Sequence, residues 1–181
     1  DTQAPQFTSS FSQVDLACNP AASDIEAALN GATATDNCGQ PTVTVTGTSD
    51  PTGTCVKTQT RTFRAVDGCG NTATASRTVT WKSDTQAPGF TGSYTQVDLA
   101  CNPAASDIEA ALDGATATDN CGTPTVTTLS TSDATGTCVK TQTRTFRAVD
   151  GCGNTSTVSR TVTWKSDTQA PGFTGSYTQV N

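Results

Sequence analysis

The sequence predicts an all-β protein of tandem domains, and three observations lead to this prediction. The pentapeptide Asp-Thr-Gln-Ala-Pro occurs at Asp1, Asp84 and Asp167. The chain therefore contains two complete copies of a repeat, the first at residues 1–83, and the beginning of a third copy. The first two copies are identical at 71 of 83 positions. Each copy contains four cysteines and short runs rich in Thr and Val, separated by Gly, Pro, Asn and Asp. Such a pattern is typical of repeated small β domains with disulfides.

The repeat defines the expected domain boundaries. Residues 1–83 form one domain, residues 84–166 a second, and residues 167–181 the first strand of a third. A unit of this length is long enough to enclose its own core. With a hydrophobic fraction of only 33% and no methionine, however, burial alone leaves such a domain marginally stable. We therefore expect cross-links to supply part of the stability.

The first third of each copy is expected to hold a strand and a short helix. Apolar residues spread over 7–16 indicate an extended strand that can break in its middle and that ends at Cys18. The segment Ser23-Asp24-Ile25-Glu26 matches a capping box with Ser23 as the N-cap, and Gly31 ends the helix. One or two helical turns are expected between them.

The remainder of each copy is expected to be strands and turns. In the first copy the strands are expected at residues 32–35, 42–46, 55–66 and 72–81. Turns rich in Asp, Asn and Gly separate them. Several short strands with one helical turn predict an antiparallel β-sandwich of the immunoglobulin type in each copy.

The cysteines predict two disulfides in each copy. The chain has no histidine and no Cys-x-x-Cys pair, which argues against zinc, and an even number of cysteines in a small domain favours an oxidising compartment. In a sandwich, the cysteine that ends the first strand and the cysteine that begins the long strand lie at one pole. The two turn cysteines lie at the other. The expected pairs are Cys18–Cys55, Cys38–Cys69, Cys101–Cys138 and Cys121–Cys152.

The same topology brings acidic residues to the pole of the two turns. They are the opening Asp, one Asp from each turn and one Asn: Asp1, Asp36, Asp67 and Asn71 in the first copy, and Asp84, Asp119, Asp150 and Asn154 in the second. Converging carboxylates repel one another, and Ca²⁺, which takes about 6–8 oxygen ligands, relieves this repulsion. Asp and Asn are also common turn formers. A calcium site and simple turns are therefore both open interpretations.

The unit also resembles a known family. Asp-Thr-Gln-Ala-Pro, Thr-Asp-Asn-Cys-Gly and Val-Asp-Gly-Cys-Gly-Asn-Thr resemble the HYR-like and bacterial immunoglobulin-like repeats of large surface adhesins, including gliding-motility adhesins of Bacteroidetes. The resemblance covers the whole unit and implies Ca²⁺ at domain junctions, held by the Asp and Asn residues named above. The cysteine inside each turn departs from the family pattern, so a disulfide can replace the metal as the clamp.

Charge and composition disfavour several classes of function. The net charge is -6, without the clustered Lys and Arg that nucleic-acid binding requires. No apolar run approaches the roughly 18 residues of a membrane span, so no membrane insertion is expected. Without histidine, a nucleophile–base pattern or a glycine-rich phosphate loop, the chain is not expected to be an enzyme.

The expected function is therefore structural. The chain is expected to be a repeat of an extracellular bacterial surface protein, a stiff, disulfide-stapled stalk that presents or forms an adhesive surface for an unknown surface or glycan ligand. Its expected partners are neighbouring repeats. One alternative is a filament in which residues 167–181 complete another copy by strand addition. Another is a carbohydrate-binding module in which Trp81 or Tyr94 stacks on a sugar.

Overall fold

The computed structural model describes residues 1–8, 10–168, 172 and 174–175, which form a mostly β chain with 35% strand and 9% helix. The first copy contains α1 (Ala22–Leu29), β1 (Thr44–Thr48), β2 (Gln59–Arg64) and β3 (Arg77–Val79). The second contains β4 (Gly89–Thr91), β5 (Val97–Cys101), α2 (Ala105–Leu112), β6 (Thr116–Thr118), β7 (Thr125–Thr131), β8 (Val139–Val149) and β9 (Thr155–Lys165). In the described part of the chain, neither helix is long and apolar enough to cross a membrane.

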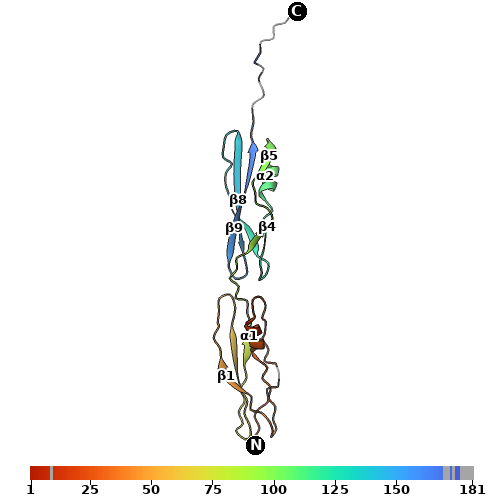
Figure 1. The fold of residues 1–181 in the computed structure, drawn as a ribbon, viewed down its shortest axis with the longest axis vertical. Helices are drawn as coiled ribbons and strands as arrows, with labels where there is room; N and C mark the ends of the chain where they lie inside the picture. The colour runs from red at the N-terminus through yellow and green to blue at the C-terminus, as the bar shows by residue number, and fades with distance from the viewer. Residues whose placement is uncertain (9, 169–171, 173, 176–181) are drawn as a thin grey trace, which may run out of the picture. The chain divides into compact units, whose positions relative to one another are not determined.

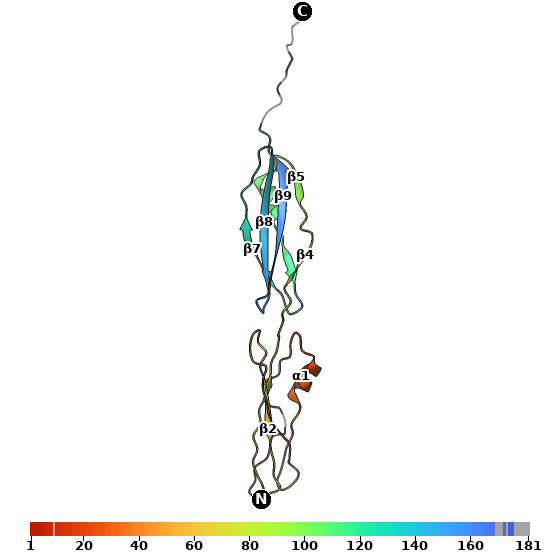
Figure 2. The same ribbon diagram turned by 60° about the vertical axis from the view of Figure 1, so that its left-hand side comes forward.

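The strands of the described residues form three sheets, with the orders β1-β2-β3, β4-β6 and β5-β9-β8-β7. In the first sheet both neighbouring pairs are antiparallel. In the third, β5 runs parallel to β9 and pairs Val97 with Val162 and Cys101 with Lys165. The long strands β8 and β9 lie side by side (Figures 1 and 2). The end of β9 therefore lies next to Cys101.

The chain divides into two compact units. The first comprises Asp1–Gly89, Ala117–Thr125 and Ala148–Ser156, and the second comprises Phe90–Thr116, Val126–Arg147 and Thr157–Asn181. The first unit thus includes the two turns of the second copy that carry Asp119 and Asp150. The boundaries predicted from the repeat stay a prediction, and most of residues 167–181, the predicted third-copy strand, lies outside the described residues.

Several predicted elements are present, more completely in the second copy. The expected first strand is broken there into β4 and β5, and the expected strand after the helix is β6. The long strand is β2 in the first copy and β8 in the second, and the last strand is β3 and β9. The β-rich class and a helix of two turns per copy are confirmed. The immunoglobulin-type sandwich remains a finer prediction.

Each unit buries a small core beside its helix. In the first, Ile25 and Leu29 of α1 (labelled in Figure 1) are buried with Val79, and the partly buried Trp81 packs against them. In the second, Leu112, Phe146 and Val162 are buried. Equivalent cation–π contacts complete both: Arg77 lies 5.3 Å from the Phe11 ring centre, and Arg160 lies 5.2 Å from that of Tyr94.

The helix N-terminus differs from the predicted capping box. Both helices begin one residue before the expected N-cap serine, so the N-cap residues are Ala21 and Ala104. At α2 the backbone N–H of Ala104 donates to Asp107 Oδ2 at 3.0 Å. The predicted capping glutamate instead forms an ion pair with the long strand, at 2.6 Å in both copies: Glu26–Arg61 and Glu109–Arg144. In the first copy the pairing gives the buried Arg61 an opposite charge, and in the second Asp113 also lies 3.6 Å from Arg144.

The two helices have the same sequence but opposite backbone hand. From Ser23 to Ala28 of α1, φ lies between 34° and 48°, whereas α2 has no positive φ. The left-handed helix brings Cβ too close to the following carbonyl, by about 1–2 kcal/mol per residue. Identical octapeptides cannot encode both hands by local preference. The local preference of these L-residues is for the right-handed form of α2.

Candidate metal centre

The structure brings together the two predicted sets of aspartates. One carboxylate oxygen from each of Asp1, Asp36 and Asp67 lies within 4.8 Å of the others, and the same holds for Asp84, Asp119 and Asp150. We call these the first and the second acidic cluster. Both belong to the first compact unit. The predicted convergence of three distant segments is therefore confirmed, while the metal itself stays a prediction.

A turn of the same design positions each turn aspartate. The carboxylate of Asp119 accepts a hydrogen bond from the Cys121 N–H at 2.8 Å, and that of Asp150 accepts one from the Cys152 N–H at 2.7 Å. In the first copy, Asp36 accepts equivalently from Cys38 at 2.8 Å. Asp67 accepts from Cys69 in the same way. A bond from the residue two positions on is an Asx turn, which explains why Asp-x-Cys recurs.

Asp84 is the most enclosed member of either cluster. The residue is only 5% exposed, and its Oδ1 accepts a hydrogen bond from the Gln86 N–H at 3.2 Å. Among the described carboxylates, Asp84 Oδ2 and Asp119 Oδ1 of the second cluster and Asp36 Oδ2 of the first are buried without a hydrogen-bond partner. Leaving a buried charged oxygen unsatisfied is strongly unfavourable. These oxygens therefore need a counter-charge that the described side chains do not supply.

The donor set fits a hard cation. Oxygen ligands lie about 2.3–2.6 Å from Ca²⁺, so two of them on one ion are at most about 5 Å apart. The separation of at most 4.8 Å within each cluster satisfies this limit. Arg61 and Arg144 form ion pairs with Glu26, Glu109 and Asp113, none of which belongs to a cluster. The carboxylates are thus available for a metal.

The predicted asparagines hold the clusters together. Asn154 Nδ2 donates to Asp150 Oδ2 at 2.7 Å and to the backbone oxygen of Asp84 at 3.4 Å. Asn71 Nδ2 donates to Asp67 Oδ2 at 3.0 Å. Its Oδ1 accepts from the Thr2 hydroxyl at 2.7 Å. The amides therefore position the carboxylates, and their predicted role as metal ligands stays a prediction.

Asp150 is held in its charged form. Burial acts to raise the pKa of this carboxyl, but the hydrogen bond from Asn154 Nδ2 and three backbone N–H donors together lower the pKa below its ordinary value of 3.8. Those donors belong to Cys152, Asn154 and Gly153. Hydrogen bonds to a carboxylate favour its ionised state. The turn thus presents a full negative charge to the cluster.

The predicted disulfide pairing is wrong. Cys18 is bonded to Cys121 and Cys55 to Cys152, with Cα–Cα distances of 5.2 and 5.0 Å. The expected pairs Cys18–Cys55, Cys38–Cys69, Cys101–Cys138 and Cys121–Cys152 are not formed, and Cys38, Cys69, Cys101 and Cys138 are unpaired. Each bond joins a strand-end cysteine of the first copy to a turn cysteine of the second.

The contacts around Asp84 explain why the cysteines pair between copies. The Ser83 N–H donates to the Cys55 oxygen at 3.1 Å, which places this cysteine next to the start of the second copy. The carboxylate of Asp84 lies within 4.8 Å of those of Asp119 and Asp150, which belong to the turns that carry Cys121 and Cys152. A strand-end cysteine therefore meets the turns of the following copy. The Asp-x-Cys pattern ties each turn cysteine to an acidic cluster, but it is the same in both copies, so the sequence holds no signal for pairing between copies.

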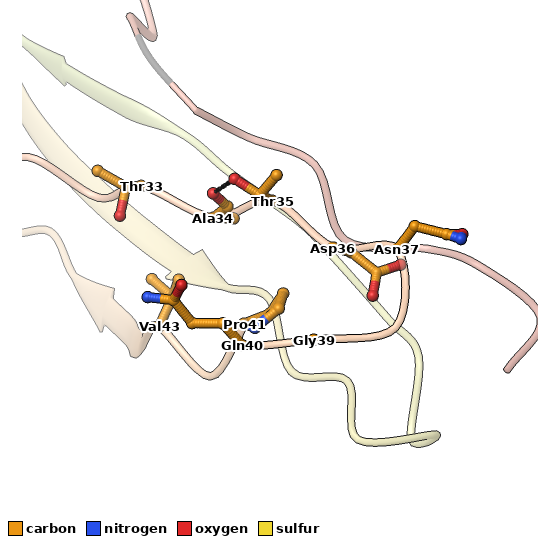
Figure 3. Close-up of a pocket in the computed structure, with 9 residues that line it drawn as sticks. All are labelled: Thr33, Ala34, Thr35, Asp36, Asn37, Gly39, Gln40, Pro41 and Val43. Carbon is orange, nitrogen blue, oxygen red and sulfur yellow. Dashed lines mark hydrogen bonds between the residues drawn. The ribbon is translucent and has the colours of Figure 1, made fainter.

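A hollow of about 580 Å³ lies beside the first acidic cluster (Figure 3). It is lined by small and polar residues: Thr33, Ala34, Thr35, Asp36, Asn37, Gly39, Gln40, Pro41 and Val43. No aromatic ring lines it, so it lacks the stacking surface expected of a sugar site. The two aromatic residues suggested for stacking are engaged elsewhere, Trp81 with the core and Tyr94 beneath Arg160.

Comparison of the chain with protein families, curated proteins and solved structures finds no match.

Proposed function

We propose that this chain is a load-bearing segment of an extracellular surface protein, in which a cation and a pair of disulfides clamp the start of each copy. The observation that carries the proposal is Asp84: it is 5% exposed, and its Oδ2 lacks a hydrogen-bond partner among the described residues. Ca²⁺ bound by Asp84, Asp119 and Asp150 satisfies those carboxylates. A non-catalytic role is favoured because the acidic residues recur in each copy beside cysteines.

The disulfides support a mechanical role. The bonds Cys18–Cys121 and Cys55–Cys152 span 103 and 97 residues and both bracket Asp84. A chain pulled from its termini transmits tension through the sulfur atoms, so its extension between Cys18 and Cys152 is limited to the shortest covalent path, residues 121–152. At about 3.4 Å per extended residue, the first bond withholds roughly 350 Å of chain. Such a restraint suits a stalk in an oxidising environment outside the cell.

Adhesion and gliding motility enter this proposal through the family resemblance, and a surface or glycan ligand is an expectation from the same source. The stalk role has more support than the carbohydrate-binding alternative, because the candidate stacking residues are already in contact with other side chains. The filament alternative depends on residues 167–181, most of which lie outside the described residues.

Thermal unfolding with excess Ca²⁺ and with excess chelator tests the cation clamp. A ligand present at about 100 times its Kd stabilises the folded state by about 2.7 kcal/mol, which raises the unfolding midpoint by several degrees. Asp119→Asn should abolish most of this rise. Asp133→Asn, which removes the same charge from an exposed residue outside the cluster, should retain it. An unchanged midpoint in the native chain would exclude the clamp.

A further inference from the structure

We propose that the four unpaired cysteines are covalent attachment points for further copies of the same unit, joined head to tail. Cys38 and Cys69 would receive a preceding copy, and Cys101 and Cys138 a following one. This inference extends the proposed function to the identity of the partner, and it does not require a bound cation.

The repeat relates every unpaired cysteine to a bonded one. Cys121 and Cys152 occupy the same positions of the second copy that Cys38 and Cys69 occupy in the first. In the same way, Cys101 and Cys138 are the second-copy equivalents of Cys18 and Cys55. The two observed disulfides therefore follow one rule: a strand-end cysteine bonds to a turn cysteine of the next copy. The unpaired cysteines are those whose partners, under that rule, belong to copies before or after the two complete ones.

The turn cysteines are held in the same way whether bonded or not. Cys38 N–H donates to Asp36 Oδ1 at 2.8 Å, as Cys121 N–H does to Asp119 Oδ2 at 2.8 Å. Cys69 likewise donates to an aspartate two residues before it. The turns of the first copy are thus already formed for the bond that their equivalents make in the second. A preceding copy needs no rearrangement of these turns to attach.

The unpaired strand-end cysteines of the second copy lie in surroundings similar to those of their bonded equivalents in the first. The Ser166 N–H donates to the Cys138 oxygen at 2.7 Å, which reproduces the bond from Ser83 to Cys55 at 3.1 Å. Cys101 pairs with Lys165 at the end of β9. Both cysteines therefore flank the point at which the third copy begins in the sequence, at Asp167. For Cys138 this matches the position of Cys55 next to Ser83, where the second copy begins.

Exposure separates the two sets of cysteines. All four unpaired cysteines are exposed, whereas the four bonded ones are half-buried. Cys38 and Cys69 share one cluster of turns, yet their bonded equivalents each take a separate partner from the other copy rather than joining each other. The exposed thiols are therefore accessible for bonding to cysteines of other copies.

The bond forms by thiol–disulfide exchange. One thiolate attacks a small disulfide such as oxidised glutathione and releases one glutathione thiol. The second cysteine then attacks the mixed disulfide and releases the other. Overall, two cysteine thiols lose two protons and two electrons, and one glutathione disulfide becomes two glutathione thiols.

Thiol labelling of the oxidised chain provides the first test. An alkylating reagent applied to the native protein, followed by peptide mapping without reduction, should modify Cys38, Cys69, Cys101 and Cys138 and no other cysteine. Recovery of the peptide pairs Cys38–Cys69 or Cys101–Cys138 would overturn the proposal, since the thiols would then be satisfied within their own copy. Labelling of all eight cysteines would also overturn the proposal, because the two disulfides between the copies would then not have formed.

Lengthening the chain until its third copy is complete provides the second test. After refolding with oxidised glutathione, Cys101 and Cys138 should become protected and should be recovered linked to the turn cysteines of the third copy. The number of reactive thiols should remain four, because the third copy adds two new strand-end thiols. Continued reactivity of Cys101 and Cys138 would contradict the proposal. Cys101→Ser should free only its predicted partner, which separates loss of one bond from loss of folding.

Discussion

The two acidic clusters are built from the same residues but differ in enclosure. In the first, Asp1 is exposed and the adjacent Cys38 and Cys69 are unpaired. In the second, Asp84 is 5% exposed, and the adjacent Cys121 and Cys152 are bonded to residues of the preceding copy. The turn hydrogen bonds are common to both. The preceding copy therefore contributes Cys18 and Cys55, which bond to the cysteines of the second cluster.

Enclosure matters because it changes the electrostatic environment of identical carboxylates. Water screens the charge of an exposed aspartate, so Asp1 needs no specific partner. The buried oxygen of Asp84 loses that screening, which strengthens both its repulsion by neighbouring carboxylates and its attraction to a cation. We therefore expect the second cluster to bind Ca²⁺ more tightly than the first.

The largest effect should come from removing the bonded cysteines. Cys121→Ser together with Cys152→Ser opens both loops, and a loop of about 100 residues contributes about 4.7 kcal/mol in the chain-entropy account. The two bonds close overlapping but different loops, residues 18–121 and 55–152. Their contributions are therefore nearly additive in this account, and we expect a loss of about 5–9 kcal/mol. Chemical denaturation measures it. The matched variant Cys38→Ser with Cys69→Ser should change stability by less than about 0.5 kcal/mol; an equal loss would show that enclosure is not the difference.

Next in size is the response to Asp84→Asn. With saturating Ca²⁺ this change should lower stability by about 2–3 kcal/mol, because a ligand is lost. With chelator the same change should raise stability or leave it unaltered, since neutralising a buried unpaired carboxylate relieves repulsion. Asp1→Asn should have little effect in either condition. Calorimetric unfolding of both variants in both buffers measures the comparison, and matching responses would mean that burial does not distinguish the clusters.

A smaller effect should distinguish the two helices. Glycine in a right-handed helix lowers stability by roughly 0.5–1 kcal/mol relative to alanine, whereas at a positive φ it relieves strain. Six left-handed residues at about 1–2 kcal/mol each would approach the whole stability of a small domain. Ala27 lies at a φ of 41° in α1, whereas Ala110 lies in the right-handed helix α2. We therefore expect Ala27→Gly to raise stability and Ala110→Gly to lower it in denaturant titrations. Equal losses for the two variants would contradict the difference in hand between the helices.

The smallest effect should be a change in pH dependence at the second cluster. Because the pKa of Asp150 is lowered in the folded state, its charge contributes stability above its unfolded pKa near 3.8, and this is lost as pH falls through the lower folded value. Asn154→Ala removes one donor, so the folded pKa should rise and the acid dependence should become shallower. An NMR titration of the Asp150 carboxyl measures this shift. Asn120→Ala, in an exposed turn position, should leave the titration unaltered.

Local rules predicted the parts that depend on neighbours in the sequence. The apolar run and Gly31 indicated a helix of two turns, and the Thr-rich runs indicated strands that the structure contains as β2, β3, β8 and β9. The Asp and Asn composition located the turns, and sandwich topology predicted that three distant aspartates meet. The predicted N-cap was wrong by two positions, because the Asp107 carboxylate accepts a hydrogen bond from the N–H of Ala104.

The cysteine pairing could not be predicted in this way. Sequence spacing is the same for pairing within one copy and between copies, because identical units leave each cysteine with equivalent candidates in either. The choice depends on which segments meet at Asp84, and this is a long-range contact.

By itself, the sequence determined the period, the β-rich class, the turns and the identity of the acidic residues, since these follow from local preference and repetition. Tertiary structure alone decided that Asp84 is buried, and that Cys18 and Cys55 bond to the turns of the following copy. The physical reason is that burial and disulfide formation depend on which segments occupy the same space. Identical residues do not carry that information in their own sequence.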